Sequence, residues 1–271
     1  MHLKYLPEEN YLLLIGSNFV PAGSQYLNVN SKQRSLSLME KLFQAYKNLL
    51  EERLNRKPLL LLGEDSIRYD FFAALMEAYS FRPSQIQIEV PINSQTFIPA
   101  KEKISYRNEK PLIDLVIDEP GLRLSAEFGL FRQNSNEDGT INKTARLVKM
   151  LNDMIRVSLE AHFTNTTGLF ICVADHKMIG HQIRSNIVDP FPADYVINND
   201  IINHQLEQKT NKFDKRFLKV FQPLKKDIAS TLIVNEQLRA KKIKHETRLL
   251  IWKVSITGMP TTNIGIVNNG S

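Results

Sequence analysis

Two alternating apolar segments joined by a tight turn constrain the fold of this chain more than any other feature. The apolar residues recur at every second position on either side of the turn sequence Asp118-Glu-Pro-Gly121, and they are Ile113, Leu115, Ile117, Leu122, Leu124, Ala126 and Phe128. A period of two is typical of strands with one buried face, and Pro-Gly is typical turn chemistry. The segment therefore predicts a β-hairpin.

The polar positions of this hairpin carry the first candidate site. If the turn centres between Glu119 and Pro120, every apolar residue lies on one face of the hairpin. Asp114 then lies directly opposite Ser125 and diagonal to Glu127, with about 7–8 Å between the backbones. Carboxylates from neighbouring strands at that separation can share one cation.

The remaining elements follow from periodicity and from turn residues. A helical period is expected over residues 31–56, and a second helix begins near Gly63, with Ser66 or Asp65 as its cap. Residues 1–30 suggest a strand, Tyr11–Ile15, and loops. Further elements are expected as a strand at 86–90, a helix at 142–160, a strand at 168–174, a helix or helix pair within 202–226, and strands at 230–234 and 248–256. The tail 257–271 is expected to be loose.

Composition restricts the class of protein. The 271 residues are 42% apolar and 24% charged, which is ordinary for a globular chain, and we expect a single α/β domain over residues 1–256. The formal net charge of +6 permits a polyanionic partner. The lone Cys172 lies in an apolar run, so we expect a buried thiol. We find no signal sequence and no membrane-spanning segment, so we expect no membrane partner and a cytoplasmic location.

The order of these elements resembles a known nuclease core. Helix, strand, hairpin bearing Asp114 and then Glu127, helix and apolar strand resemble the PD-(D/E)XK superfamily over residues 63–174. The resemblance implies a restriction-endonuclease-like fold, with a central mixed sheet flanked by helices and helical additions on its N- and C-terminal sides. It also implies that Asp114 and Glu127 bind Mg²⁺ (or Mn²⁺), assisted by Glu64 at the head of its helix.

The chain departs from that family at one position. The family places a lysine two residues after the glutamate, where it positions or activates the attacking water, and Gly129 stands there in this chain. Phosphodiester hydrolysis needs a hydroxide-like nucleophile and positive charge near phosphorus, and glycine supplies neither. Gly129 leaves room on the metal face, so we expect Lys149, from the following helix, to replace the lysine. Lys143 is the second candidate.

Each candidate has a structural alternative. An Asp followed by a Glu is a weak pattern by itself. Glu64 could serve only to stabilise a helix N-terminus. Lys149 and Arg156 could lie on a solvated helix face, paired with Asp153. His176 and His181 lack a nearby cysteine, which disfavours zinc.

Basic residues in the C-terminal third, residues 200–256, give independent support for nucleic-acid binding. They would contact phosphates without recognising a base sequence, and the candidates are Lys212, Lys215, Arg216, Lys219, Lys241 and Lys242. An amphipathic surface helix would carry the same charges. The spacing of Phe213, Phe217 and Phe221 indicates core residues rather than platforms for stacking bases.

The sequence is compatible with three functions. The first is a Mg²⁺-dependent deoxyribonuclease, with a role in restriction or mobile-element defence, in which Glu64, Asp114, Glu127 and Lys149 are catalytic. The second is an inactive protein of the same fold that binds nucleic acid or another protein, and it gains from Gly129. The third is an interaction protein with no nucleic-acid role. DNA and RNA are both compatible substrates, and a homodimer is compatible with the sequence. The nuclease function would be excluded if Asp114 and Glu127 lay on opposite sides of the sheet, or if either were buried against an arginine with no opening to solvent.

Overall fold

The described part of the chain forms one compact unit. The computed structural model describes residues 37–99, 111–132, 141–183, 188–203 and 213–258, all within the unit Leu36–Ser271. The expected strand Tyr11–Ile15, the candidate Lys212 and the tail from residue 259 lie outside these residues. No helix among those ranges is long and apolar enough to span a membrane.

The elements follow the expected order, with one short strand that sequence periodicity missed, β5. They are α1 (Leu38–Arg56), η1 (Leu59–Leu61), α2 (Glu64–Tyr79), η2 (Pro83–Gln85), β1 (Gln87–Pro91), β2 (Leu112–Glu119), β3 (Leu122–Phe131), α3 (Lys143–Thr164), β4 (Thr167–Asp175), β5 (Tyr195–Ile197), α4 (Asn199–Ile201), α5 (Lys215–Leu224), β6 (Ile228–Gln237) and β7 (Thr247–Ile256).

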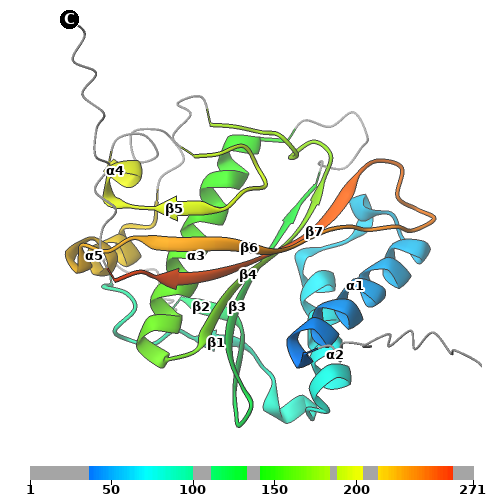
Figure 1. Ribbon diagram of the computed structural model, residues 1–271, viewed down its shortest axis with the longest axis horizontal. Helices are drawn as coiled ribbons and strands as arrows, with labels where there is room; N and C mark the ends of the chain where they lie inside the picture. The colour runs from blue at the N-terminus through cyan, green and yellow to red at the C-terminus, as the bar shows by residue number, and fades with distance from the viewer. Residues whose placement is uncertain (1–36, 100–110, 133–140, 184–187, 204–212, 259–271) are drawn as a thin grey trace, which may run out of the picture. The chain divides into compact units, whose positions relative to one another are not determined.

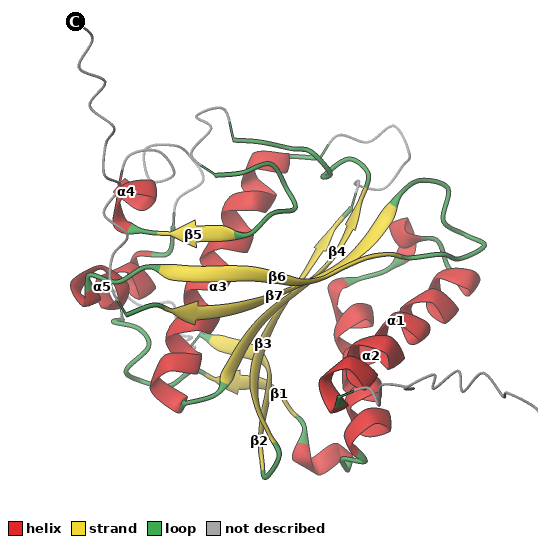
Figure 2. Ribbon diagram, in the orientation of Figure 1, coloured by secondary structure: helices red, strands yellow, loops and turns green. Residues whose placement is uncertain are grey.

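The strands form one seven-stranded mixed sheet in the order β1-β2-β3-β4-β7-β6-β5 (Figure 2). Strands β3 and β4 are parallel, and α3 makes the connection between them. The other neighbouring pairs are antiparallel. A parallel pair needs such a crossover helix, which explains why α3 lies next to the hairpin.

Both faces of the sheet are covered by helices, because the central strands are apolar on both sides. In β4, Phe170 and Cys172 pack in a cluster with α3 and α5, whereas Leu169 and Ile171 pack in a second cluster with α1 and α2. Figure 1 shows α1 and α2 together on one side of the sheet and α3 on the other. The expected α/β architecture, a mixed sheet flanked by helices, is therefore confirmed.

Polar side chains cap the starts of α1, α3, α4 and α5, whereas the cap expected for α2 is absent. Ser37 begins α1 with a capping box that includes Glu40, and the Asn142 side chain caps α3 by accepting from Ala145 N–H. The cap expected at Ser66 or Asp65 is wrong, because the N-cap of α2 is Gly63, which makes no side-chain hydrogen bond.

The hairpin has the expected strands but a different register. Leu115 pairs with Ala126, and Val116, rather than Asp114, pairs with Ser125. The tight turn explains the offset of two residues, since Glu119 pairs with Leu122 around a Pro-Gly turn whose glycine has a φ of 100°. Pro followed by a positive-φ Gly is typical of a type II turn.

The expectation that all apolar residues of the hairpin share one face is also wrong. Ile113 packs in the cluster on the α3 side, whereas Leu115 and Ile117 pack on the side of α1 and α2. The change of face occurs at Asp114, whose carboxylate accepts the Phe128 N–H at 2.9 Å. Asp114 therefore lies in β2 between Ile113, which packs on the α3 side of the sheet, and Leu115, which packs on the side of α1 and α2.

Candidate functional site

The structure brings the predicted catalytic residues together from separate elements. Glu64 is the first residue of α2, Asp114 lies in β2, Glu127 in β3 and Lys149 in α3. Asp114 is close enough to raise the pKa of both Glu64 and Glu127. Together with the neighbouring Arg68, Asp153 and Arg156, these residues form what we call the acidic cluster.

Asp114 is held by the backbone and by an arginine. One carboxylate oxygen accepts the Phe128 N–H, and the other lies 3.3 Å from Nη1 of Arg68. Arg68 is itself buried and also contacts Asp65 and Glu89. Asp114 keeps 23% of its side chain exposed, so this acid has an opening to solvent.

Glu127 has no such opening. Its side chain is 1% exposed, and both of its oxygens are bound by Arg156, with Nε donating to Oε1 at 2.7 Å and Nη2 donating to Oε2. Burial raises the pKa of the Glu127 carboxyl, and the Arg156 guanidinium opposes that shift. A fork-to-fork pair of this kind is the strongest way for a protein to hold a carboxylate.

Lys149 belongs to the same network. Its Nζ lies 2.8 Å from Oδ2 of Asp153 and 3.9 Å from Oε1 of Glu64. Burial lowers the pKa of Lys149, but Asp153 and Glu64 outweigh burial, so the net shift is upward. Lys149 is therefore an ammonium ion that can supply charge but cannot accept a proton near neutral pH.

The positions of Glu64 and Lys143 bear on two alternatives from the sequence. These are whether Glu64 only stabilises a helix N-terminus, and whether Lys143 rather than Lys149 replaces the missing lysine. Glu64 begins α2, so it can interact favourably with the helix N-terminus, and it also faces Lys149. Burial raises the pKa of Glu64, and Lys149 lowers it in part. Lys143, the second candidate for the missing lysine, lies instead beside His176 and His181, whose pKa values it lowers.

Gly129 does not leave room on the metal face, contrary to our expectation. A Cβ placed on Gly129 would lie 3.0 Å from the ring of Phe170 and 3.2 Å from the ring of Phe131. These rings are fully buried. The position that would hold the family lysine is therefore filled by aromatic side chains, and Gly129 is needed for their packing.

The roles of the two arginines in the acidic cluster, Arg68 and Arg156, were not predicted from sequence patterns. Arg156 lay on the expected polar face of α3, but its partner Glu127 is distant in sequence. Arg68 was missed altogether. The signal for Arg68 was its position one helical turn after Glu64, which places both residues on the same face of α2.

The expected Mg²⁺ or Mn²⁺ does not fit the arrangement of these side chains. A divalent ion of this class needs oxygen lone pairs directed at one point. Both oxygens of Glu127 and both of Asp114 already accept hydrogen bonds from protein donors. Within the described ranges, no group of three or more acidic, histidine or cysteine side chains is placed to hold a metal ion.

The basic C-terminal candidates fall into two separate groups. Lys215, Arg216 and Lys219 lie on α5, which packs against α3. Lys241 and Lys242 lie on the loop between β6 and β7, which packs on α1 through hydrogen bonds to Asn55 and the Leu54 carbonyl.

The basic side chains differ in whether they form an ion pair. Arg216 is paired with Asp214 at 2.7 Å, whereas Lys215, Lys219, Lys241 and Lys242 are exposed. The phenylalanines Phe213, Phe217 and Phe221 are buried, which confirms the expectation that they are core residues.

Comparisons with known proteins leave the resemblance resting on the residues themselves. No protein-family model, no curated protein and no solved structure matches this chain.

Proposed function

We propose that this chain binds the phosphate backbone of nucleic acid on a restriction-endonuclease-like fold, without metal-dependent cleavage. The single observation that carries the second half of the proposal is the Glu127 carboxylate, sealed from solvent in the fork of Arg156. A carboxylate that is buried against an arginine, with no opening to solvent, argues against a metal site at that position.

Three features of the acidic cluster oppose hydrolysis. A metal ion could reach Glu127 only by displacing Arg156, and separating a buried ion pair leaves an uncompensated charge that costs several kcal/mol. The Lys149 ammonium is already balanced by Asp153. Gly129 supplies no donor, and the aromatic rings around it exclude a replacement side chain. The cluster is therefore suited to holding β2, β3, α2 and α3 together.

Support for backbone binding comes from the exposed lysines and the net charge of +6. Lys241 and Lys242 extend from a loop whose backbone is fixed on α1, because Arg239 N–H donates to Glu51 and Lys241 N–H donates to Asn55, each at 2.8 Å. A fixed loop loses little conformational entropy on binding. Lysines that neutralise phosphates release counterions and bind without sequence preference.

A second candidate function is the Mg²⁺-dependent deoxyribonuclease. It is favoured by the gathering of Glu64, Asp114 and Glu127 beside Lys149 from four separate elements. In this candidate, Arg156 would have to leave Glu127 for its other partner, Asp153, which lies 3.1 Å away. Asp114 and Glu127 would then hold the ion with help from Glu64, and Lys149 would supply positive charge.

One experiment distinguishes these functions. Labelled duplex DNA, single-stranded DNA and RNA are titrated with the protein by fluorescence anisotropy between about 50 and 200 mM salt, and the same mixtures are incubated with Mg²⁺ or Mn²⁺ and analysed for cleavage. We expect binding that weakens steeply with salt and no cleavage. Cleavage by the wild-type chain that Asp114→Asn abolishes would establish the nuclease instead. An absence of affinity at low salt would leave only an interaction protein.

A further inference from the structure

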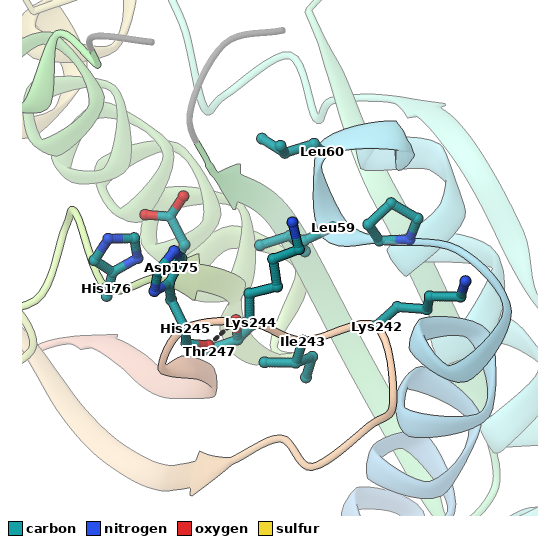
Figure 3. A pocket seen from close by; sticks show the side chains of 10 residues that line it. Leu59, Leu60, Asp175, His176, Lys242, Ile243, Lys244, His245 and Thr247 are labelled. Atoms are coloured by element: carbon teal, nitrogen blue, oxygen red, sulfur yellow. Dashed lines mark hydrogen bonds between the residues drawn. The ribbon is translucent and has the colours of Figure 1, made fainter. Parts of the chain in front are cut away.

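A small pocket outside the acidic cluster is lined by lysines and histidines, and one of these histidines has a buried ring nitrogen without a partner among the described residues. The pocket has a volume of about 70 Å³, far below the roughly 300–1,000 Å³ typical of sites for drug-sized ligands. Its lining comes from Pro58 and η1, from the end of β4 and the residue after it, and from the β6–β7 loop with the first residue of β7. The lining residues are Pro58, Leu59, Leu60, Asp175, His176, Lys242, Ile243, Lys244, His245 and Thr247 (Figure 3). Its size suits a small ion or a single chemical group.

Two histidines form one wall of this pocket. The rings of His176 and His245 lie 4.3 Å apart between centroids. Nδ1 of His176 is buried and has no hydrogen-bond partner among the residues that the structure describes. A buried polar atom without a partner is costly in a native protein, which indicates that a ligand or solvent group satisfies it.

The other wall is basic. Figure 3 shows Lys244 extending from the β6–β7 loop between the histidines and Leu59, with Lys242 farther along the same loop. The acid in the lining, Asp175, is 6% exposed, and its Oδ1 accepts the Lys177 N–H. The lining of the pocket therefore contains two lysines and two histidines beside one acid.

We propose that this pocket binds a phosphate group, held between the two histidines and the loop lysines, Lys242 and Lys244. A phosphate oxygen can accept from a protonated imidazole, and lysine ammonium groups are common phosphate ligands. The apolar side chains of Leu59 and Ile243 also line the pocket, and a charge-assisted contact beside apolar groups is stronger than one in open water.

The pocket is lined by the same β6–β7 loop that we propose binds nucleic acid. The proposal that its phosphate belongs to a nucleic acid rests on that proposed function. Glu127 is level with Phe170 in the parallel β3–β4 pair, and Asp175 ends β4 five residues later. At about 3.3 Å per residue, the pocket lies about 17 Å along the sheet from the acidic cluster. A nucleic-acid strand bound at the β6–β7 loop could place one backbone or terminal phosphate there. A free phosphate could occupy the same pocket.

The charges around His176 predict how binding depends on pH. Burial lowers the pKa of His176, His245, Lys177 and Lys143 lower it further, and Asp175 opposes them. Together these effects lower the pKa of the His176 imidazole from its ordinary value. A bound anion favours the imidazolium form and raises that pKa, so binding takes up a proton and tightens as the pH falls, by at most about tenfold per pH unit per proton.

The test begins with sulfate, because it keeps its double negative charge across the range in which histidine titrates. Histidine C–H resonances of the full chain are followed by NMR during titration with sulfate and then with inorganic phosphate, with His176→Asn used for assignment. We expect saturable shifts of the His176 and His245 signals, stronger at mildly acidic pH, and no shift of His162. Replacing Lys242 and Lys244 together by Ala should weaken the sulfate affinity about tenfold or more. Lys41→Ala, an exposed lysine on α1, should leave it unchanged.

A second arm identifies the source of the phosphate. Oligonucleotides with and without a 5′-terminal phosphate are titrated against the wild type and the Lys242→Ala/Lys244→Ala variant. Loss of oligonucleotide affinity in that variant supports a nucleic-acid phosphate as the ligand. Sulfate shifts without oligonucleotide binding would support a free phosphate and reject the proposed function. Unperturbed histidine signals, with equal oligonucleotide binding by both proteins, would overturn the pocket and leave the proposed function in place.

Discussion

The guanidinium of Arg156 binds both carboxylate oxygens of Glu127 in the interior of the protein, where the glutamate side chain is 1% exposed. Arg156 reaches Glu127 from the helix that connects the two parallel strands, so the ion pair links α3 to β3. It occupies the position at which the family resemblance implies a metal ion. The same pair therefore bears on both stability and function.

Breaking this pair from one side should destabilise the fold strongly. We expect Arg156→Met to lower the free energy of unfolding by about 3–5 kcal/mol, because it leaves a buried carboxylate without a counterion. The double variant Glu127→Leu/Arg156→Met should recover most of that loss. Urea unfolding measures both, and Arg56→Met, which removes an exposed pair with Glu52, should cost less than about 1 kcal/mol. Equal losses for the single and double variants would contradict the claim that the buried Glu127 carboxylate, left without a counterion, destabilises Arg156→Met.

The deficit of Arg156→Met should depend on pH in a defined direction. Burial already raises the pKa of Glu127, and removal of the guanidinium that opposes this shift raises it further. An acid with a raised folded-state pKa contributes stability that is present below its unfolded pKa and is lost as the pH rises through the folded value. The variant should therefore approach the wild type in stability as the pH falls, which unfolding curves across acidic and neutral pH would show. A deficit that grows on acidification would be inconsistent with this ion pair.

Asp114 should have a structural role that is separable from any catalysis. Asp114→Ala leaves the Phe128 N–H without its acceptor and removes a partner of the buried Arg68, so we expect a loss of about 1–3 kcal/mol. Asp114→Asn keeps a carbonyl acceptor and should lose less. Thermal and urea unfolding of the pair measure the difference, and identical stability of both variants with the wild type would show that the carboxylate does not hold the β2–β3 junction.

Introducing at position 129 the lysine that the resemblance implies should destabilise the protein and should not activate it. Gly129→Lys and even Gly129→Ala should cost about 1–3 kcal/mol, because the new Cβ meets the Phe170 and Phe131 rings. The matched control is Gly63→Ser, where a Cβ meets nothing within 4 Å and the hydroxyl can cap α2, so stability should stay equal or rise. A folded Gly129→Lys protein with metal-dependent cleavage would refute this view of the position.

The arrangement of strands and helices was predictable from the sequence because it depends on local patterns. The alternation around 113–128 and the apolar run ending at Ala174 identified β2, β3 and β4, and helical periodicity identified α1, α2 and α3. The hairpin register was missed by two residues because it depends on a Pro-Gly turn at 120–121, which composition alone does not position. Sequence patterns gave no sign that Ile113 and Leu115 would pack on different sides of the sheet.

The candidate site was predictable in membership but not in chemistry. The resemblance identified Glu64, Asp114, Glu127 and Lys149, and the structure gathers them. The partners of these residues depend on contacts between distant segments, such as Arg156 with Glu127 or Phe170 with Gly129. No periodicity encodes such contacts, so neither the Glu127–Arg156 pair nor the packing of the aromatic rings against Gly129 was predicted. The pairing of Lys149 and Arg156 with Asp153 lies within one helix, and the helical spacing predicted it as the structural alternative.

The two basic groups should contribute unequally to nucleic-acid binding. We expect Lys241→Ala and Lys242→Ala each to weaken binding and to reduce the slope of log K against log salt by about one, because these side chains are exposed on a loop fixed to α1. Lys215→Ala and Lys219→Ala on α5 serve as charge-matched controls. Larger losses for the α5 variants in fluorescence anisotropy would move the interface to that helix.

The central claim is that the Glu127–Arg156 pair prevents divalent-metal chemistry, and Mn²⁺ binding tests it most directly. Electron paramagnetic resonance of Mn²⁺ titrated with the wild type and with Asp114→Asn, alongside a cleavage assay on the same samples, reports both occupancy and turnover. We predict the same weak Mn²⁺ binding for both proteins and no cleavage of bound DNA. Saturable Mn²⁺ binding by the wild type that Asp114→Asn removes, accompanied by DNA cleavage, would contradict the account.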